Sequence, residues 1–403
     1  MSESSVSYLW REPNAARAFR AGVSLHSHTN QSRETLDFIA ELSMDWRMLQ
    51  PVIRWCERRC LRSSGIRPDY VRSFWTPPLT PRLAFDLELQ QIEEKLQIAG
   101  MVSLTDHDNI RAPLLLQVLP ATRDIPVSVE WTVPFGGTAF HLGIHNLPGA
   151  TATEWMRRFE EFTDSATAST DSGPAVPGRE AAMLDKRLNG LLAELGELAQ
   201  VLVVFNHPVW DLYRIGKERH MAKVSNFLAA NGQYVHSLEL NGLRSWKENQ
   251  EVVTLASKWN QVVISGGDRH GVEPNANLNL TQAASFTEFV REVRKERKSH
   301  VLFMPQYAEP WKHRLLQSTL AAVHDYPEFP AGSMRWDERV FHPDAHGELR
   351  PLAELWGGRR APGYIRIALA AVRVTGRQPI SSGLRLAWND AREERKASIR
   401  TKA

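Results

Sequence analysis

The sequence predicts an α/β fold built from parallel β/α units. Short apolar runs rich in β-branched residues alternate with helical patterns, and several of these runs end at histidine, aspartate or glutamate. Alternating strands and helices favour parallel units over a sandwich of antiparallel sheets. In a β/α barrel, functional groups lie at the carboxyl ends of the strands, which is where these polar residues fall.

Composition limits the class of protein. The 403 residues are 42% hydrophobic and 24% charged, which is typical of a soluble globular chain with one large barrel and an appendage, or with two to three domains. The net charge of +3 does not by itself favour a nucleic-acid partner. The two cysteines, Cys56 and Cys60, cannot form a larger disulfide framework, and we find no leader or spanning segment. We therefore expect a cytoplasmic protein with no membrane partner; the composition predicts no oligomeric state.

The first expected strand, "AGVSLHSH" at residues 21–28, ends in two histidines. In a strand, His26 and His28 would point to the same side and could share a metal ion. The alternative is a pair of surface histidines on a strand edge. The choice depends on whether later segments supply partners.

Later apolar runs supply such partners at or near their ends. The residues concerned are Asp106, His107 and Asp108, Glu130, His141 and His145, His207, Glu239 and Asn241, and Asp268 and His270. Each alone has an ordinary structural explanation, such as a helix cap or a buried imidazole bonded to the backbone. Together they favour one polar cluster.

Helical patterns separate the expected strands. The segment after Thr80 predicts a helix with Thr80 as N-cap, Pro81 in the first turn and Gly100 just past its end. Residues 181–200 predict another helix directly before the strand at 201–205.

Three segments depart from this alternation. Residues 38–80 form a largely helical insertion rich in arginine and tryptophan, expected to be a lid, a substrate-side wall or a packing elaboration. Residues 164–180 are small and polar with glycine and proline, which predicts a mobile loop. Residues 306–403 contain no chemical motif and are expected to be an extension of unknown role after a domain spanning 1–305.

The cluster of imidazoles and carboxylates, with no cysteine, is suited to two or three divalent metal ions, either Mn²⁺, Zn²⁺ or Fe²⁺. The chain contains no phosphate-binding glycine loop, dinucleotide fingerprint, serine elbow or H-E-x-x-H motif.

In order, "HSH", "TDHD", "VSVEWT", "FHLGIH", "FNHP" and "GGDRH" resemble the motifs of the PHP (polymerase and histidinol phosphatase) family of metal-dependent phosphoesterases. The resemblance covers residues 20–305. It implies a distorted (β/α)₇ TIM-like barrel with metal ions at its carboxyl end.

The resemblance also implies a ligand set. His26, His28, Glu130 and Asp268 would hold a first ion, Glu130 would bridge to a second ion held by His141 and His207, and His107 and His270 would hold a third. Asp106 would orient the neighbouring imidazoles. Where many members place an aspartate, this chain has Arg33, so Glu34 becomes the candidate third-site ligand. If Glu34 is not a ligand, the cluster would hold only two ions and Arg33 would face the substrate phosphate instead.

The implied activity is hydrolysis of a phosphoester by a metal-activated hydroxide, with a small organic phosphate or nucleotide as substrate. Asp106, His107, Asp268 and Arg269 are the candidate catalytic residues, with Arg269, then Arg214 and Lys217, anchoring the phosphate. Trp131 and Trp210 are candidates for stacking on a ring. The alternatives are a nuclease acting on DNA or RNA ends, an amidohydrolase-like enzyme, and a metal- or phosphate-binding module without activity.

Overall fold

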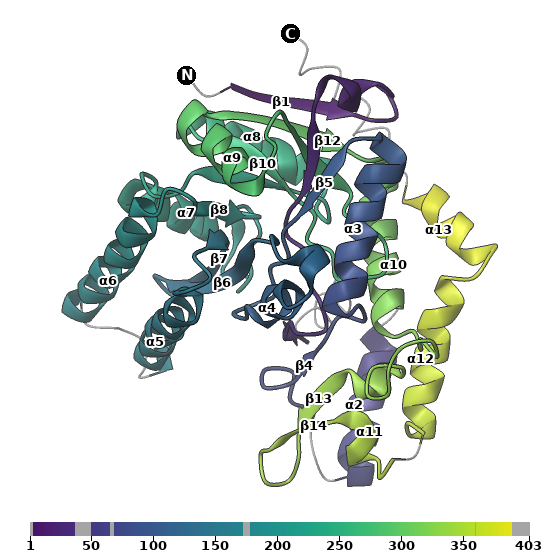
Figure 1. Cartoon of the computed structure of the whole chain (residues 1–403). Coiled ribbons are helices and arrows are strands. Elements are labelled where there is room, and N and C mark those ends of the chain that lie inside the picture. Colours follow the sequence, from purple (N-terminus) through teal and green to yellow (C-terminus); the bar gives the residue numbers. More distant parts are fainter. Residues whose placement is uncertain (1–2, 37–49, 65–67, 172–177, 359, 389–403) are drawn as a thin grey trace.

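The computed structural model describes residues 3–36, 50–64, 68–171, 178–358 and 360–388, and these form three β-sheets with helices between and around them (Figure 1). The first sheet has the strand order β1 (Glu3–Tyr8), β12 (Lys298–Phe303), β11 (Asn277–Thr281), β2 (Ala21–Ser24) and β5 (Ala99–Val102). The β1–β12 and β2–β5 pairs are parallel, whereas β11 is antiparallel to both of its neighbours.

The second sheet has the order β10 (Val262–Gly266), β9 (Ser237–Asn241), β8 (Leu202–Asn206), β7 (Thr138–Leu147) and β6 (Val127–Phe135). Strands β8, β9 and β10 are parallel, and β7 is antiparallel to both β6 and β8. Gly136 and Gly137, both at positive φ, join β6 to β7. A two-residue turn of this kind requires that conformation and can connect only antiparallel strands.

The third sheet is small and antiparallel, with the order β14 (Leu349–Pro351), β13 (Val340–Pro343), β4 (Phe74–Trp75) and β3 (Glu34–Thr35). It joins residues from three distant parts of the chain. Because β3 contains Glu34, residues of the 38–80 segment and of the C-terminal segment are held next to a predicted metal ligand.

The prediction of one closed TIM-like barrel is wrong for the described residues, which form three mixed or antiparallel sheets instead. Between the two five-stranded sheets, the described residues form isolated bridges, at His107–Glu130 and Ser27–Arg269, and side-chain hydrogen bonds join Ser265 of β10 to Asn279 of β11. Near the second of these bridges, His26 and Asp268 have φ values of 61° and 55°, which do not fit an extended ladder. The chain leaves strand geometry at the points where the polar cluster forms.

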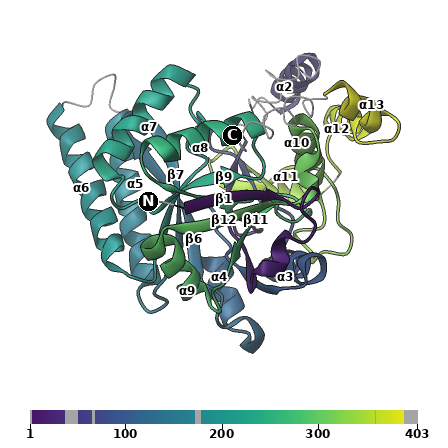
Figure 2. The same ribbon diagram turned by 90° about the horizontal axis from the view of Figure 1, so that it is seen from above.

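Helices cover the two larger sheets, as Figure 2 shows from above. Their bounds are α2 (Gln50–Ser64), α3 (Pro81–Leu96), α4 (Arg111–Gln117), α5 (Ala152–Asp171), α6 (Gly178–Glu197), α7 (Lys217–Asn231), α8 (Trp246–Lys258), α9 (Phe286–Arg291), α10 (Trp311–Ala322), α11 (Leu352–Leu355), α12 (Gly363–Thr375) and α13 (Ile380–Ala387). The largest apolar core lies between the second sheet and helices α5 to α8. None of the described helices is long and apolar enough to cross a membrane.

Helix α3 begins as predicted, because the Thr80 side chain accepts a hydrogen bond from the Leu83 amide and Pro81 occupies the first turn. Its end differs from the prediction. Gln97, in the left-handed conformation, terminates the helix, and Gly100 lies in β5. A Cβ at Gly100 would lie 2.5 Å from the Leu89 side chain, so the glycine allows close packing of helix on strand.

The loop predicted at residues 164–180 is wrong at both of its ends. Helix α5 continues to Asp171 and α6 begins at Gly178, while 172–177 lie outside the described residues.

Within the 38–80 segment, residues 50–64 form the helix α2, and 38–49 and 65–67 are outside the described residues. Residues 311–322 form α10, which lies beside the polar cluster described next.

Candidate metal centre

The nine residues predicted as metal ligands lie together in the structure. They fall into four overlapping groups in which the ligand atoms lie within 4.8 Å of one another: His28, Glu34, His107 and His270; His26, Glu130 and His207; His26, His28 and Asp268; and His107, Glu130 and His141. All nine are buried or partly buried. Loops that follow β2, β5, β8 and β10 supply six of them, whereas Glu130 and His141 lie within β6 and β7, and β3 supplies Glu34.

Glu130, on β6, occupies the centre of the cluster. Its Oε1 lies 3.3 Å from His141 Nδ1 and 3.1 Å from His207 Nε2. Its Oε2 lies 3.0 Å from His26 Nε2 and 3.3 Å from His28 Nε2. The two oxygens of one carboxylate therefore face two separate sets of imidazoles, which is the arrangement of a ligand that bridges two ions.

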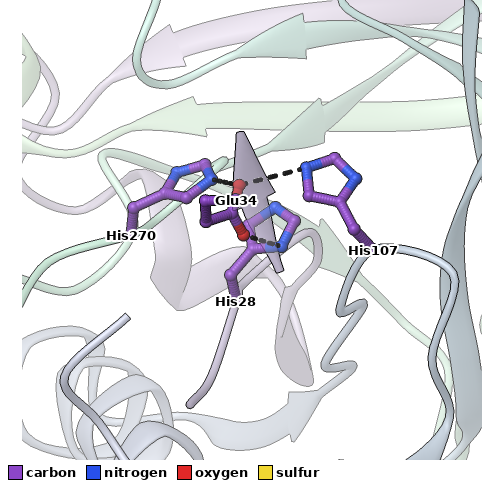
Figure 3. Close-up of side chains that lie close together, drawn as sticks. All are labelled: His28, Glu34, His107 and His270. Carbon is purple, nitrogen blue, oxygen red and sulfur yellow. Dashed lines mark hydrogen bonds and ion pairs between the residues drawn. The ribbon is translucent and has the colours of Figure 1, made fainter. Parts of the chain in front are cut away.

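Glu34 occupies a similar position for a third set of imidazoles (Figure 3). Its Oε2 lies 3.0 Å from His270 Nε2 and 3.2 Å from His107 Nε2, and its Oε1 lies 3.4 Å from His28 Nδ1. Ser32 donates a hydrogen bond of 2.5 Å to the same Oε1. The carboxylate at residue 34, one residue after Arg33, is thus shared by three imidazoles.

His26 and His28 converge for a different reason from the one predicted. Strand β2 ends at Ser24, and His26 has a φ of 61°, so the pair lies on a loop and does not alternate along a strand. His207 and Asp268 also have positive φ, at 27° and 55°. Such conformations cost about 1–3 kcal/mol each and are concentrated at functional sites.

Three residues that hold the cluster were not assigned from the sequence. Glu239 Oε2 lies 2.8 Å from His26 Nδ1, which directs Nε2 of that ring into the centre. Asn241 donates to Glu239 at 2.6 Å and to Asp268 at 3.0 Å, and Asn206 donates to Glu130 at 2.9 Å. The sequence contains a signal for these three residues, because Glu239 and Asn241 lie near the end of an expected strand and Asn206 precedes His207 in "FNHP".

Gly266 makes room for Glu239. A Cβ at residue 266 would lie 2.2 Å from the Glu239 Cδ, so a larger residue would displace the carboxylate from beneath His26. The first glycine of "GGDRH" therefore has a steric role in the site.

Asp106 does not contact an imidazole, contrary to the prediction. Its carboxylate accepts hydrogen bonds from the backbone amide and the hydroxyl of Thr29, at 2.5 and 2.8 Å, and so fixes the loop directly after His28. Burial raises its pKa to about 6. His145 lies apart from the cluster, with Nδ1 2.8 Å from the Ser103 hydroxyl.

The structure does not support Arg269 as a phosphate anchor. Its guanidinium is buried and donates to Glu88 at 2.9 Å, to the Gly271 carbonyl at 2.8 Å and to the His28 carbonyl at 3.1 Å. All three nitrogens therefore have partners inside the protein. Arg269 joins the loop of His28 to the loop of Asp268 and His270, which is a structural role.

The carboxylates and imidazoles of the cluster shift one another's pKa values. Although burial opposes the charged form of each group, the charges of Glu130 and Glu239 raise the pKa of His26 well above its ordinary value. Glu34 and Glu130 likewise raise the pKa of His107 to about 10 against the effect of burial. Neighbouring histidines lower the pKa of Glu130 well below its usual range. The cluster without metal therefore holds protons at neutral pH.

We expect metal affinity to rise with pH for this reason. Imidazoles bind metal only when neutral, so ions must displace protons from His26 and His107. Since these protons are still bound near pH 7, affinity for Mn²⁺ or Zn²⁺ should rise roughly tenfold per pH unit for each proton displaced, between about pH 6 and pH 8. Competition with a chromophoric chelator measures this, and an affinity independent of pH would contradict the expectation.

The donor set fits a group of divalent ions. Within the described part of the chain, His26 Nε2, His28 Nε2 and Glu130 Oε2 are buried atoms that make no hydrogen bond, although the two nitrogens lie 3.0 and 3.3 Å from that oxygen. Buried polar atoms left without hydrogen bonds are costly. Nitrogen and oxygen ligands directed at common points are what Zn²⁺, Mn²⁺ and Fe²⁺ bind.

A cleft of about 590 Å³ opens above the cluster. The cluster residues that line it are Glu34, His107, His141, His207, Asp268 and His270, its aromatic residues are Trp75, Trp210, Tyr213 and Trp311, and its arginines are Arg33, Arg214 and Arg244. Arg244 was not predicted; its guanidinium stacks 3.9 Å from the Trp210 ring centre.

Trp131 and Lys217, which are also predicted to contact the substrate, do not line the cleft. Trp131 is fully buried and stacks on Phe159 at 4.3 Å, so it belongs to the core. Lys217 pairs with Glu251 at 2.6 Å and is not among the residues that line the cleft.

No protein-family model matches the chain, and no curated protein matches its sequence. Among solved structures, it is similar to an amidohydrolase from Chromobacterium violaceum, with 17% identity and a TM-score of 0.33 over 48% of this chain and 83% of the other. It is also similar to a protein from Bifidobacterium adolescentis assigned as a metal-dependent phosphoesterase (16% identity, TM-score 0.30, 54% and 91% of the chains). A third similar structure is that of PsfC from Pseudomonas syringae, with 15% identity and a TM-score of 0.36 over 59% of this chain and 88% of the other.

Proposed function

We propose that this chain is a metal-dependent phosphoesterase of the PHP type, acting on a small organic phosphate. The observation that supports it is the position of Glu130, whose two oxygens face His141 and His207 on one side and His26 and His28 on the other. A carboxylate between two sets of imidazoles is suited to a pair of ions.

The residues that would hold the ions are the members of the four groups, divided as the resemblance implies. Glu130 would be shared by an ion at His26, His28 and Asp268 and by an ion at His141 and His207, whose ring nitrogens lie 3.3 Å apart, and Glu34 would hold a third with His107 and His270. Bound ions of this kind supply Lewis-acid chemistry, in which water is activated and phosphoryl charge is neutralised. Glu239 and Asn241 would keep His26 and Asp268 in place during that reaction.

The cleft favours a phosphoester over a neutral substrate. Its arginines, Arg33, Arg214 and Arg244, lie on the same surface as the cluster and are suited to phosphate oxygens. The aromatic side chains beside them suit a leaving group of moderate size.

Metal content and phosphate release test this proposal together. We expect two or three equivalents of metal in protein purified without chelator, and release of phosphate from a panel of phosphomonoesters with added Mn²⁺. Chelation should abolish turnover. A panel that also contains oligonucleotides and N-acyl substrates identifies the alternatives, and hydrolysis of only one of those classes would overturn the phosphatase assignment.

Glu34→Gln should remove one ion and leave the others. The amide cannot replace the carboxylate charge shared by His107 and His270, whereas Glu130 and its partners are unchanged. The metal content measured by elemental analysis should therefore fall by about one equivalent per chain. Glu161→Gln, an exposed change on α5, is the matched control. Unchanged stoichiometry in Glu34→Gln would remove Glu34 from the ligand set.

Arg244→Gln should raise the KM for the phosphoester more than it lowers kcat. The change removes a guanidinium that would bind substrate oxygens, and loss of such a charge-assisted bond costs about 1.5–3 kcal/mol, or roughly 10- to 150-fold in kcat/KM. Steady-state kinetics separate the two constants. An unchanged KM would show that Arg244 does not contact the substrate.

A further inference from the structure

A second surface, distant in sequence from the metal ligands, is built where α2 and α12 pack together. About 300 residues separate these helices in the chain, but they lie side by side in Figures 1 and 2. Trp55 of α2 meets Tyr364 of α12 edge to face at 6.3 Å, and the Cys56 thiol donates to the Tyr364 carbonyl at 3.9 Å.

This surface is strongly basic. Helices α2 and α12 contain six arginines and one acidic residue, Glu57, a net charge of +5 in a chain whose total is +3. Arg54, Arg58 and Arg62 recur every four residues and are exposed along one side of α2. Within the described ranges, none of these three arginines forms an ion pair with a carboxylate.

The same surface exposes apolar side chains. Ile367 and Val374 are 64% and 39% exposed, and with Ala370 and Ala371 they follow helical spacing along one stripe of α12. No residue of α12 is fully buried. A groove of about 310 Å³ between the helices has Trp55, Tyr364 and Ile367 beside Arg59 and Arg62.

We propose that the face formed by α2 and α12 binds the surface of an anionic phospholipid membrane. Arginines beside exposed aliphatic and aromatic side chains are typical of helices that lie in the interface of a bilayer, where phosphates meet the acyl chains. A nucleic acid would use the arginines but leave Ile367 and Val374 in water. A second copy of the chain would bring two +5 faces together, which opposes association.

The expectation of no membrane partner rests on the lack of an apolar run long enough to span a membrane. Peripheral binding needs no spanning helix. The groove and the cleft above the metal cluster share no lining residue. The proposal therefore does not depend on the phosphoesterase assignment.

Sedimentation of the full chain with vesicles tests it. We expect binding to phosphatidylcholine vesicles that contain about one-third phosphatidylglycerol, weaker binding to phosphatidylcholine alone, and loss of binding as salt is raised. Arg58→Ala with Arg62→Ala should lower the partition coefficient roughly 30-fold, since each arginine near such a surface contributes about 1 kcal/mol. Ile367→Ser should lower it roughly tenfold.

The control is Arg291→Ala with Lys295→Ala, which removes two exposed cations near α9 and should leave binding unchanged. Metal content should be the same in all variants. Equal binding to both vesicle types, or none, would overturn the proposal. So would tight binding of an oligonucleotide that depends on the arginines but not on Ile367, or self-association that the arginine changes abolish.

Discussion

Glu130→Gln should abolish phosphoester hydrolysis and most metal binding while the fold is retained. The amide has nearly the shape of the carboxylate, but it carries no charge and can present only one oxygen to the imidazoles. Five histidines lie within 3.3 Å of the carboxylate. No neighbouring side chain can replace both of the oxygens that these histidines surround. We expect kcat/KM to fall roughly 10³-fold or more, about 4 kcal/mol of transition-state stabilisation.

Glu239→Gln is the matched comparison for this change. Glu239 is buried in the same cluster but bonds only to the outer nitrogen of His26 and to Asn241, so its loss should cost roughly 10- to 100-fold in metal affinity or activity. Elemental analysis, steady-state kinetics and circular dichroism distinguish the two variants. Normal metal content in Glu130→Gln, with activity within tenfold of that of the unchanged protein, would contradict the assignment of Glu130 as a bridging ligand.

Glu88→Ala should have the largest effect on stability. Glu88, on α3, is fully buried and accepts hydrogen bonds from Arg269 at 2.9 Å, from Ser24 at 2.8 Å and from the Asn275 amide at 3.2 Å. Its removal would leave the Arg269 charge buried without a partner. Breaking a buried pair in this way costs about 3–5 kcal/mol of the free energy of unfolding.

Metal affinity should fall in the same variant, because Arg269 lies between the ligands Asp268 and His270 and also holds the His28 carbonyl. Urea denaturation measures the first effect and chelator competition the second. The exposed Glu93→Ala, on the same helix, should change stability by less than about 0.5 kcal/mol. The double variant with Arg269→Ala should lose less than the sum of the single variants; simple additivity would show that the pair is not coupled.

The sequence was sufficient to name the members of the cluster but not their geometry. Strand ends with His, Asp or Glu select Glu130, His141, His207 and Asp268 because short apolar runs and the polar residues that follow them are local features. Whether Arg269 faces the substrate or Glu88 is not local. Glu88 lies 181 residues away on a helix whose pattern indicates only burial.

The closed barrel was predicted from alternation, and alternation does not determine strand direction. A two-glycine turn makes β6 and β7 antiparallel, and β11 enters the first sheet antiparallel between β12 and β2. Residue 34 pairs with residue 75, and residues 74–75 pair on their other side with a strand from 340–343, which no local pattern connects. These pairings depend on long-range packing.

By itself, the sequence determined the short apolar runs that precede the polar residues, the start of the helix after Thr80 and the set of imidazoles and carboxylates suited to metal, because periodicity, capping and residue chemistry act over a few neighbours. Only the tertiary structure decided that Glu130 lies between two sets of imidazoles, that Arg269 is held by Glu88, and that α2 and α12 share a basic and apolar face. Each of these depends on contacts between segments far apart in the chain, which no local pattern encodes.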